Sequence, residues 1–320
     1  MKKILILILM FCAIFAAVSV ITACKSPPTV EEPLLPPEPP PPPPPPPTPP
    51  SPPPSVPDAE PPDTSPPEIT VTLDPQPFSP DGDGFDDELT ITIGVKSASE
   101  VHSWHILIRE PVPPYLTFSE WSGEGMPPET IVWDGKSASG ELVQAASEYV
   151  FTVTVNNIYN NYSVFEGKIE VDVLVMREKD QNGKDILRVI VPSIMFAANA
   201  GDFKGLDESI MAKNDAILQR IAEVLNEHST YQVDVEGHAN PTTPPGTKAR
   251  EIEEKGNRRV LGNLPLSEER AKTVADYLVN LGVDRSRLTP IGVGSAGTVV
   301  EFADKDNWWK NRRVEFILEK

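Results

Sequence analysis

The sequence predicts a chain of three parts: a disordered proline-rich linker, an all-β sandwich and a two-layer α+β domain. Three observations predict this order. Most prolines lie before residue 68. Short segments in which apolar and polar residues alternate follow from there to residue 177. Segments with helical periodicity appear together with strand-like segments only after residue 177. Because each pattern is typical of a different class of structure, we expect folded domains at 68–177 and 178–320.

The 320 residues carry a formal net charge of −19, from 28 basic and 47 acidic side chains. A nucleic-acid binder needs a basic surface, so this charge argues against nucleic acid as a partner. The two cysteines, Cys12 and Cys24, both precede the expected domains. We therefore expect neither a disulfide nor a thiolate metal site in the folded part.

The N-terminal segment resembles the signal peptide of a bacterial lipoprotein. Two lysines precede an apolar run from Ile4 to Ile21, as in an export signal. The sequence Ile21-Thr-Ala-Cys24 resembles a lipobox, which implies removal of residues 1–23 and lipidation of Cys24. An uncleaved transmembrane helix is the alternative, because the run is long enough to span a bilayer. Lys25 favours an outer-membrane lipid anchor that faces the periplasm.

Residues 24–67 form the predicted linker. From residue 27 onward, 24 of its 41 residues are proline. That composition cannot build a packed core, and it favours polyproline II at about 3.1 Å per residue, or roughly 120 Å when extended. We interpret the tract as a spacer between a membrane and another envelope component. A ligand for a proline-recognition domain is the less favoured interpretation.

Residues 68–177 show strand periodicity and no helical period. This pattern of short strands predicts an antiparallel sandwich. Two motifs, Phe78-Ser-Pro-Asp-Gly-Asp-Gly-Phe-Asp-Asp87 and Trp133-Asp-Gly-Lys-Ser-Ala-Ser-Gly140, together resemble the FlgD-type immunoglobulin-like repeats of secreted bacterial proteins. The alternating segments are 69–73, 89–95, 104–108, 149–155 and 169–175.

Four carboxylates lie within seven residues of the first motif: Asp81, Asp83, Asp86 and Asp87. Hard oxygen ligands at this density suit a structural calcium ion. The spacing differs from that of an EF-hand, and a turn rich in Asp and Gly for its backbone geometry is the alternative. A calcium titration of thermal stability distinguishes the two. We expect no other cofactor.

Strand and helix signals alternate in residues 178–320. Asn182-Gly183 between two apolar runs predicts a hairpin. The resulting order, β-α-β-α-β-β, predicts a two-layer sheet with helices on one face. Ser267 is the expected N-cap of the second helix and Gly282 its stop. After the hairpin we expect a helix over 206–228, a strand over 231–237, a helix over 267–281, and strands over 288–293 and 313–318.

Five motifs follow in order, and together they resemble an OmpA-like peptidoglycan-binding domain over residues 185–320. The whole chain resembles an outer-membrane lipoprotein of the Pal type with an added immunoglobulin-like domain. This resemblance implies non-covalent binding of the diamino acid of the peptidoglycan stem peptide. The motifs are Ile194-Met-Phe-Ala, Gly237-His-Ala-Asn240, Asn263-x-x-Leu-Ser-x-x-Arg270-Ala, Gly292-x-Gly294 and Asn311-Arg-Arg-Val-Glu315.

The resemblance also implies roles for single residues. Arg270 holds the ligand carboxylate with its planar guanidinium, close to the start of a helix. Asn263 matches an asparagine that contacts the ligand, and either Arg312 or Arg313 lies near the pocket. Asn240 stands where the family has an aspartate that accepts from the ligand ammonium. An amide accepts without a charge, so we expect weaker binding or a ligand with altered chemistry at that end.

Asn240 and Arg270 are 30 positions apart, and the segment between them includes an insertion at 241–262. It is either a solvated loop, which we favour, or a contact for glycan or a second stem peptide. We expect a structural role for His238 in its turn. Trp308 and Trp309 are expected to pack at the rim of the site rather than to stack on sugars.

The leading function is a lipid-anchored binding module that tethers the outer membrane to the cell wall. The alternative is an envelope scaffold or adhesin, in which the immunoglobulin-like domain binds a protein partner and the OmpA-like domain only localises it. The sequence contains no nucleophile elbow, no His-Glu-x-x-His and no Gly-rich phosphate loop. An enzyme is therefore not expected.

Overall fold

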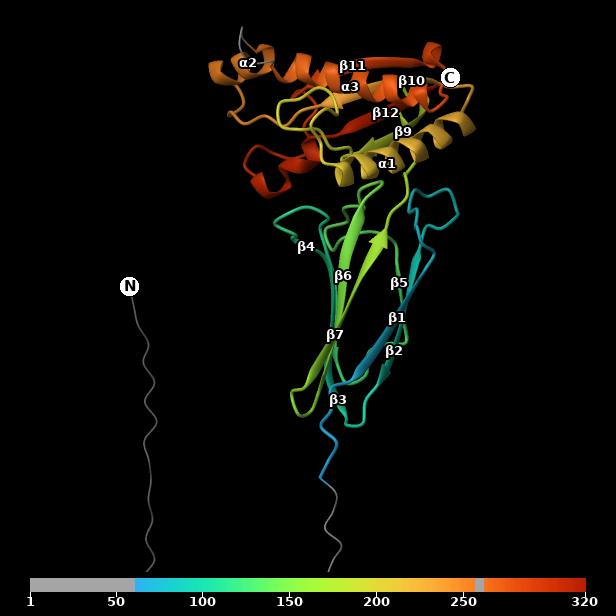
Figure 1. Ribbon diagram of the computed structural model, residues 1–320, viewed down its shortest axis with the longest axis vertical. Helices are drawn as coiled ribbons and strands as arrows, with labels where there is room; N and C mark the ends of the chain where they lie inside the picture. The colour runs from blue at the N-terminus through green and yellow to red at the C-terminus, as the bar shows by residue number, and fades with distance from the viewer. Residues whose placement is uncertain (1–60, 257–261) are drawn as a thin grey trace, which may run out of the picture. The chain divides into compact units, whose positions relative to one another are not determined.

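The computed structural model describes residues 61–256 and 262–320, which belong to one compact unit (Figure 1). The predicted signal peptide, the lipidation residue Cys24 and the linker up to residue 60 lie outside the described residues. Among the residues it describes, no helix combines the length and the apolar character that a membrane span requires.

Residues 68–170 form two antiparallel sheets that share one core, so this region is β-rich as the alternation predicted. In β2, Leu89, Ile91 and Ile93 are buried and the residues between them are less so. The sheets have the orders β1-β2-β5 and β4-β3-β6-β7. The strands are β1 (Glu68–Asp74), β2 (Leu89–Lys96), β3 (Val101–Arg109), β4 (Thr117–Glu124), β5 (Thr130–Trp133), β6 (Glu148–Asn157) and β7 (Tyr162–Glu170).

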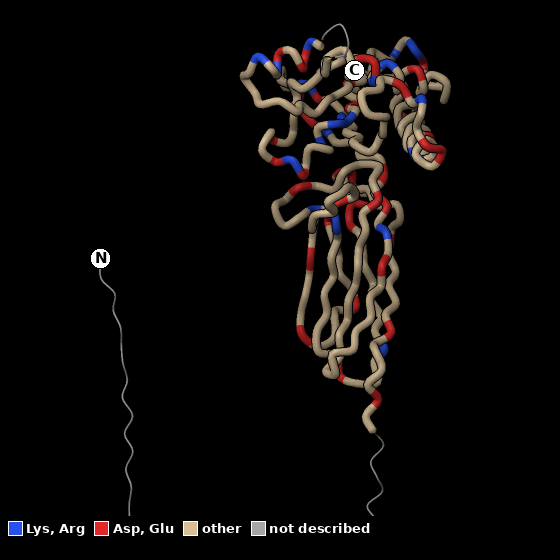
Figure 2. Tube along the Cα trace, turned by 60° about the vertical axis from the view of Figure 1, so that its left-hand side comes forward, with Lys and Arg blue, Asp and Glu red and all other residues tan. Residues whose placement is uncertain are grey.

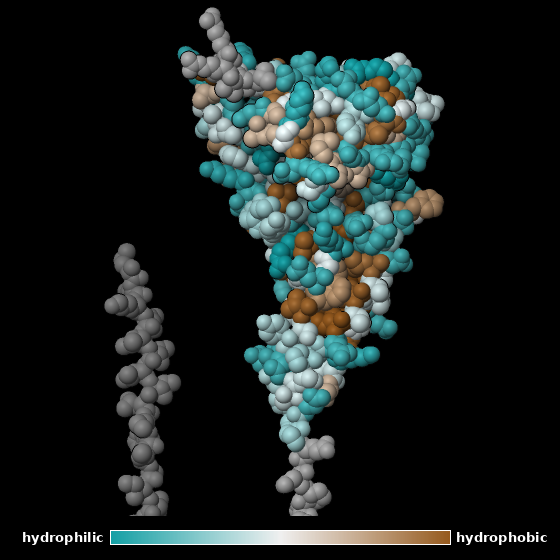
Figure 3. All heavy atoms as spheres, in the orientation of Figure 1, coloured by the Kyte–Doolittle hydropathy of each residue, from teal (hydrophilic) through white to brown (hydrophobic). Residues whose placement is uncertain are grey.

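The β-rich region has exposed apolar residues, and its charged residues are mostly acidic. Figure 3 shows apolar side chains gathered on its visible face. At the β6–β7 hairpin, Ile158, Tyr159, Tyr162 and Val164 are exposed. Acidic residues are spread along this region, whereas basic and acidic residues mix in the C-terminal domain (Figure 2). The net negative charge is thus concentrated away from the domain expected to bind a carboxylate.

A third sheet belongs to the C-terminal domain and has the order β11-β10-β12-β9-β8. β10 and β11 are parallel, and every other neighbouring pair is antiparallel. β8 begins at Met176, just before residue 178, where we expected the domain to begin. The strands are β8 (Met176–Lys179), β9 (Asp185–Val191), β10 (Gln232–His238), β11 (Leu288–Gly294) and β12 (Val314–Glu319).

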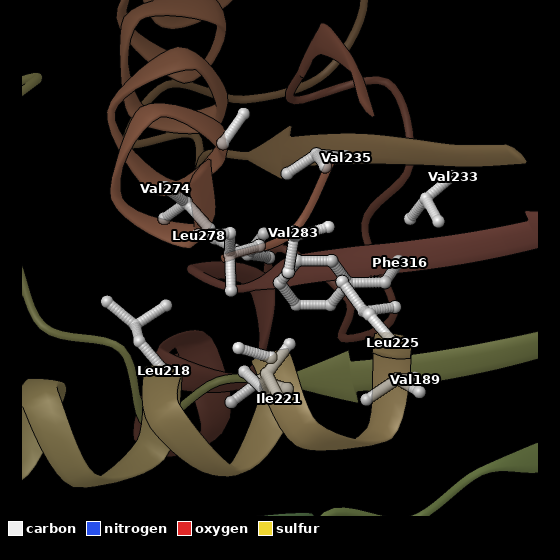
Figure 4. Packing of buried hydrophobic residues seen from close by; sticks show 14 of the residues in the cluster. Val189, Leu218, Ile221, Leu225, Val233, Val235, Val274, Leu278, Val283 and Phe316 are labelled. Atoms are coloured by element: carbon white, nitrogen blue, oxygen red, sulfur yellow. The ribbon is translucent and has the colours of Figure 1, made fainter. Parts of the chain in front are cut away.

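Two helices cover this sheet, α1 (Glu208–Glu227) and α3 (Asn263–Asn280). Figure 4 shows Leu218 and Ile221 of α1 and Leu278 of α3 in one cluster with Phe316 of β12. The buried residues of α1 recur at three- and four-residue spacing, which is the period that predicted this helix. The order β9-α1-β10-α3-β11-β12 is the β-α-β-α-β-β order expected from the sequence.

The predicted start of α3 is wrong. Gly262 caps the helix, and Ser267 lies buried within it. The Ser267 hydroxyl donates to the carbonyl oxygen of Leu264 and accepts from the amide of Gly294, each at 2.8 Å. Pro265 fits the first turn because the amides there have no helical partner. Ser267 therefore joins the helix to β11 instead of starting the helix.

The predicted solvated loop at 241–262 is also wrong in part, because it contains the helix α2 (Lys248–Lys255). Thr247 caps α2 by accepting from the amide of Arg250 at 3.2 Å. The helix has no buried residue. It therefore lacks the apolar stripe by which a helix is recognised in a sequence.

Candidate ligand-binding site

Glycines bring the start of α3 against the ends of β10 and β11. A Cβ atom at Gly237 of β10 would collide with the backbone oxygen of Ser267. A Cβ at Gly292 of β11 would lie 2.7 Å from the backbone oxygen of Leu264. Only glycine permits such an approach. Three of the predicted motifs thus meet, and they place Arg270 at the strand end that carries His238.

A cavity of about 270 Å³ lies at this junction. Its polar lining is basic and consists of Arg270, Arg312, Arg313 and His238. Of the residues that the structure describes, no Asp or Glu lines it. The sequence indicated the three arginines as site residues, whereas it assigned His238 a structural role and, of the apolar wall, placed only Trp309 at the rim of the site. That wall consists of Val112, Pro192, Ile194, Met195, Phe196, Leu206, Ile210, Trp309 and Val314.

Arg270 is held in place by neutral groups. Its Nε donates to the carbonyl oxygen of Ala200 at 3.0 Å, and its guanidinium carbon lies 5.0 Å from the ring centre of Phe196. In the described part of the chain it forms no ion pair with a carboxylate. Burial, with the nearby charge of Arg312, lowers the pKa of Arg270. The charge is therefore fixed in position but not neutralised.

The two neighbouring arginines differ in environment. Arg313 is buried and its Nε donates to Glu315 at 2.7 Å, while its Nη2 donates to the carbonyl oxygen of Gly297 at 2.9 Å. Arg312 extends towards solvent, and burial of part of its side chain lowers its pKa. Within the described residues, Arg312 has no carboxylate partner. The two arginines with uncompensated charge in this cavity are therefore Arg270 and Arg312.

Asn240 and Asn263 do not line the cavity in the described structure. The Asn240 side-chain oxygen accepts from the side-chain amide of Asn311 at 2.9 Å, and its own amide donates to the carbonyl oxygen of Pro241 at 2.9 Å. Asn263 is the first residue of α3, and its side-chain nitrogen is buried without a partner among described residues. The structure thus brings the predicted arginines together and leaves both asparagines outside the cavity lining.

His238 lies in a buried charged cluster. Its Nε2 is 3.5 Å from a carboxylate oxygen of Glu236 and 3.6 Å from one of Glu315. These three residues offer ligand atoms close enough for a metal ion. However, Arg188 and Arg313 each donate to a different oxygen of Glu315, at 2.6 and 2.7 Å. The cluster is therefore better suited to an ion-pair network than to a metal, which matches the structural role expected for His238.

The acidic loop of the β-rich region brings together three of its four carboxylates, those of Asp81, Asp83 and Asp87. Asp86 is not part of this group. Backbone amides already occupy several oxygens: Asp87 accepts from Gly82 and Gly84 at 2.7 and 2.8 Å. Burial, together with the charges of Asp83 and Asp87, raises the pKa of Asp81, although hydrogen bonds oppose this. Calcium binding by this loop stays a prediction.

Two glutamates that no sequence motif singles out hold α2 in place. The carboxylate of Glu253 accepts from the backbone amides and hydroxyls of Thr242 and Thr243. The carboxylate of Glu254 accepts from the amide and hydroxyl of Ser295. Glu253 thus holds α2 to the first residues of the insertion, and Glu254 joins the insertion to the segment that follows β11.

Comparisons with known proteins bear on this C-terminal region. Residues 203–312 match the OmpA family. The peptidoglycan-associated lipoprotein of Mesorhizobium japonicum is 36% identical over 126 residues, which cover 38% of this chain and 66% of that protein. The peptidoglycan-binding protein ArfA of Mycobacterium tuberculosis is 32% identical over 110 residues, 34% of this chain and 29% of that protein. The solved cell wall anchor of the T6SS from Pseudomonas aeruginosa is 27% identical, with a TM-score of 0.33, covering 45% of this chain and 86% of that chain.

The C-terminal domain is therefore an OmpA-like domain, as its motifs predicted. The match covers just under two thirds of the lipoprotein's length and less than a third of ArfA. The family match begins at residue 203, after the β-rich region. The lipid anchor and the immunoglobulin-like character of the β-rich region stay predictions.

Proposed function

We propose that the OmpA-like domain binds the diamino acid of the peptidoglycan stem peptide without covalent chemistry, and that the chain tethers the outer membrane to the cell wall. In this arrangement the lipid on Cys24 is the membrane end and the proline-rich tract is the spacer. The printed names of two relatives, a peptidoglycan-associated lipoprotein and a peptidoglycan-binding protein, support the proposal.

One observation carries the proposal: Arg270 and Arg312 line one cavity, and neither has a carboxylate partner in the described chain. Arg270 is partly buried, and removing its cation from water costs free energy unless an anion compensates it. A ligand carboxylate supplies that anion and accepts two parallel hydrogen bonds from a guanidinium. The apolar wall accommodates the aliphatic part of the ligand.

Retention on purified sacculi tests the binding site. We expect Arg270→Ala to weaken retention at least tenfold, because a charge-assisted hydrogen-bonded pair is worth about 1.5–3 kcal/mol. Lys272→Ala is the matched control, since Lys272 is an exposed cation on the same helix that pairs with Asp276. Equal retention of the Arg270→Ala and wild-type chains would reject this site.

Cell fractionation tests the anchor. We expect Cys24→Ala to prevent lipidation and to move the protein out of the outer-membrane fraction. If an uncleaved apolar helix held the chain instead, the variant would stay in the membrane at the wild-type level. That result would contradict the lipid anchor.

A further inference from the structure

The charge of the cavity departs from what a zwitterionic amino acid requires. Its lining includes three guanidinium groups and one imidazole and, among described residues, no carboxylate. Glu315 neutralises Arg313. The charges of Arg270 and Arg312 remain available to a ligand.

The residue expected to accept from a ligand ammonium is already engaged. The side-chain oxygen of Asn240 accepts from Asn311, whose own oxygen accepts from the amides of Val299 and Val300 at 2.8 and 3.0 Å. This chain of hydrogen bonds fixes the loop before the last strand. Asn240 is therefore held by Asn311, and it is not among the described residues that line the cavity.

The two partly buried glutamates of the inserted helix are also engaged, and neither lines the cavity. Glu253 accepts from Thr242 and Thr243, and Glu254 accepts from Ser295. Both carboxylates therefore hold α2 in place. Neither replaces the aspartate that the family has at the position of Asn240.

We propose that this cavity recognises its ligand by a carboxylate on an aliphatic chain and makes no use of the α-ammonium group. This inference rests on the proposed function and specifies the ligand class of the same site. An ammonium brought next to Arg270 and Arg312 meets like charge and no anion to offset it. A carboxylate in the same position is attracted by both arginines, and the apolar wall covers the methylene groups.

Calorimetry of the full chain with four probes tests the inference. The probes are meso-diaminopimelate, pimelate (the same diacid without amines), diaminopimelate with both carboxyls amidated, and cadaverine (a diamine without carboxylates). We expect the dissociation constants of pimelate and diaminopimelate to agree within threefold. The amidated probe and cadaverine bind at least tenfold more weakly than either diacid.

A substitution of Arg312, the exposed arginine of the cavity lining, tests whether its guanidinium group binds the ligand. Arg312 extends towards solvent, so Arg312→Gln leaves the fold intact. We expect Arg312→Gln to weaken the binding of both diacids at least tenfold. Lys305 is also an exposed cation that precedes β12, and Lys305→Gln should leave the binding of both diacids unchanged. If Arg312→Gln binds both diacids as the wild type does, the inference fails.

Retention on sacculi separates this inference from the function on which it rests. If the protein is retained on sacculi but binds diaminopimelate tenfold or more tightly than pimelate, the ammonium is recognised and only the inference fails. If both diacids bind equally and sacculi are not retained, the carboxylate specificity stands and the tethering function fails. If neither diacid binds, the inference is wrong whatever the sacculi show.

Discussion

At the scale of single residues, Glu315 is a buried carboxylate of the OmpA-like domain that accepts hydrogen bonds from two arginines. Burial raises its pKa, but the charges of Arg313 and His238 and the hydrogen bonds from Arg188 and Arg313 outweigh burial and hold the pKa below its usual value. The ionised carboxylate is thus the favoured form. It in turn compensates Arg313, one of the arginines that line the cavity.

Replacing this carboxylate should be costly. We expect Glu315→Gln to lower the free energy of unfolding by about 3–5 kcal/mol, because it leaves Arg313 buried without an anion. Glu319→Gln on the same strand removes a half-exposed pair with Lys184 and should cost about 1 kcal/mol or less. Urea unfolding of both variants measures the difference. Similar midpoints would contradict the assigned role of Glu315.

The same pair gives a pH dependence of known sign. The pKa of Glu315 is lower in the folded than in the unfolded chain, so its contribution is complete above the unfolded value of about 4.3. The contribution is lost as the pH falls through the folded pKa. The difference in unfolding free energy between wild type and Glu315→Gln should therefore shrink below about pH 4. A difference that grows on acidification would contradict the sign.

The sequence identified the residue types of the site better than their partners. The motif resemblance placed Arg270, Arg312 and Arg313, and all three line the cavity. It could not distinguish Arg312 from Arg313, because the distinction depends on which of them contacts the carboxylate of Glu315. Arg313, two residues before Glu315, makes that contact, and the pairing of β12 with β9 adds Arg188. The engagement of Asn240 by Asn311 joins residues 71 positions apart, which no local pattern reports.

At the scale of elements, α2 is held by polar contacts instead of an apolar face. Glu253 accepts from both the amide and the hydroxyl of Thr242 and of Thr243. Hydrophobic periodicity cannot reveal such a helix, so the insertion was predicted as a loop. Elements with apolar periodicity were predicted closely: the helix expected over 206–228 is α1, Glu208–Glu227.

Hydrogen exchange tests how α2 is held. We expect Glu253→Ala to speed exchange of the Thr242 and Thr243 amides at least tenfold, because both lose their acceptor. Glu251→Ala, which alters an exposed glutamate on the same helix, is the control and should leave those amides protected. Unchanged protection in Glu253→Ala would show that other contacts hold the segment.

At the scale of the whole molecule, a buried lysine connects the OmpA-like domain to the β-rich region. Lys310 donates to Glu110 at 2.8 Å and to Glu141 at 2.6 Å, and its side chain is 6% exposed. Burial raises the pKa of Glu110, and Lys310 partly offsets this. The neighbouring Trp309 lines the cavity, as does Val112 from the β-rich region. The wall of the site therefore draws on both regions, which the separate sequence patterns of the two did not indicate.

Removing this lysine should weaken the connection. We expect Lys310→Met to lower the free energy of unfolding by about 3 kcal/mol, because Glu110 stays buried without a cation. Adding Glu110→Gln should recover part of the loss, since the uncompensated charge is then absent. Lys305 and Lys310 both lie in the 3₁₀ helix Lys305–Asn311, but Lys305 is exposed, so Lys305→Met is the control. Equal stability of the Lys310 and Lys305 variants would contradict the account.

We propose that Arg270 and Arg312, two uncompensated arginines that line one cavity, bind the peptidoglycan carboxylate. The most direct measurement is the dissociation constant for purified sacculi of four chains: wild type, Arg270→Ala, Arg312→Gln and the double variant. We predict at least a tenfold loss for each single variant and no measurable retention for the double variant. If the double variant sediments with sacculi as the wild type does, the cavity is not the peptidoglycan site.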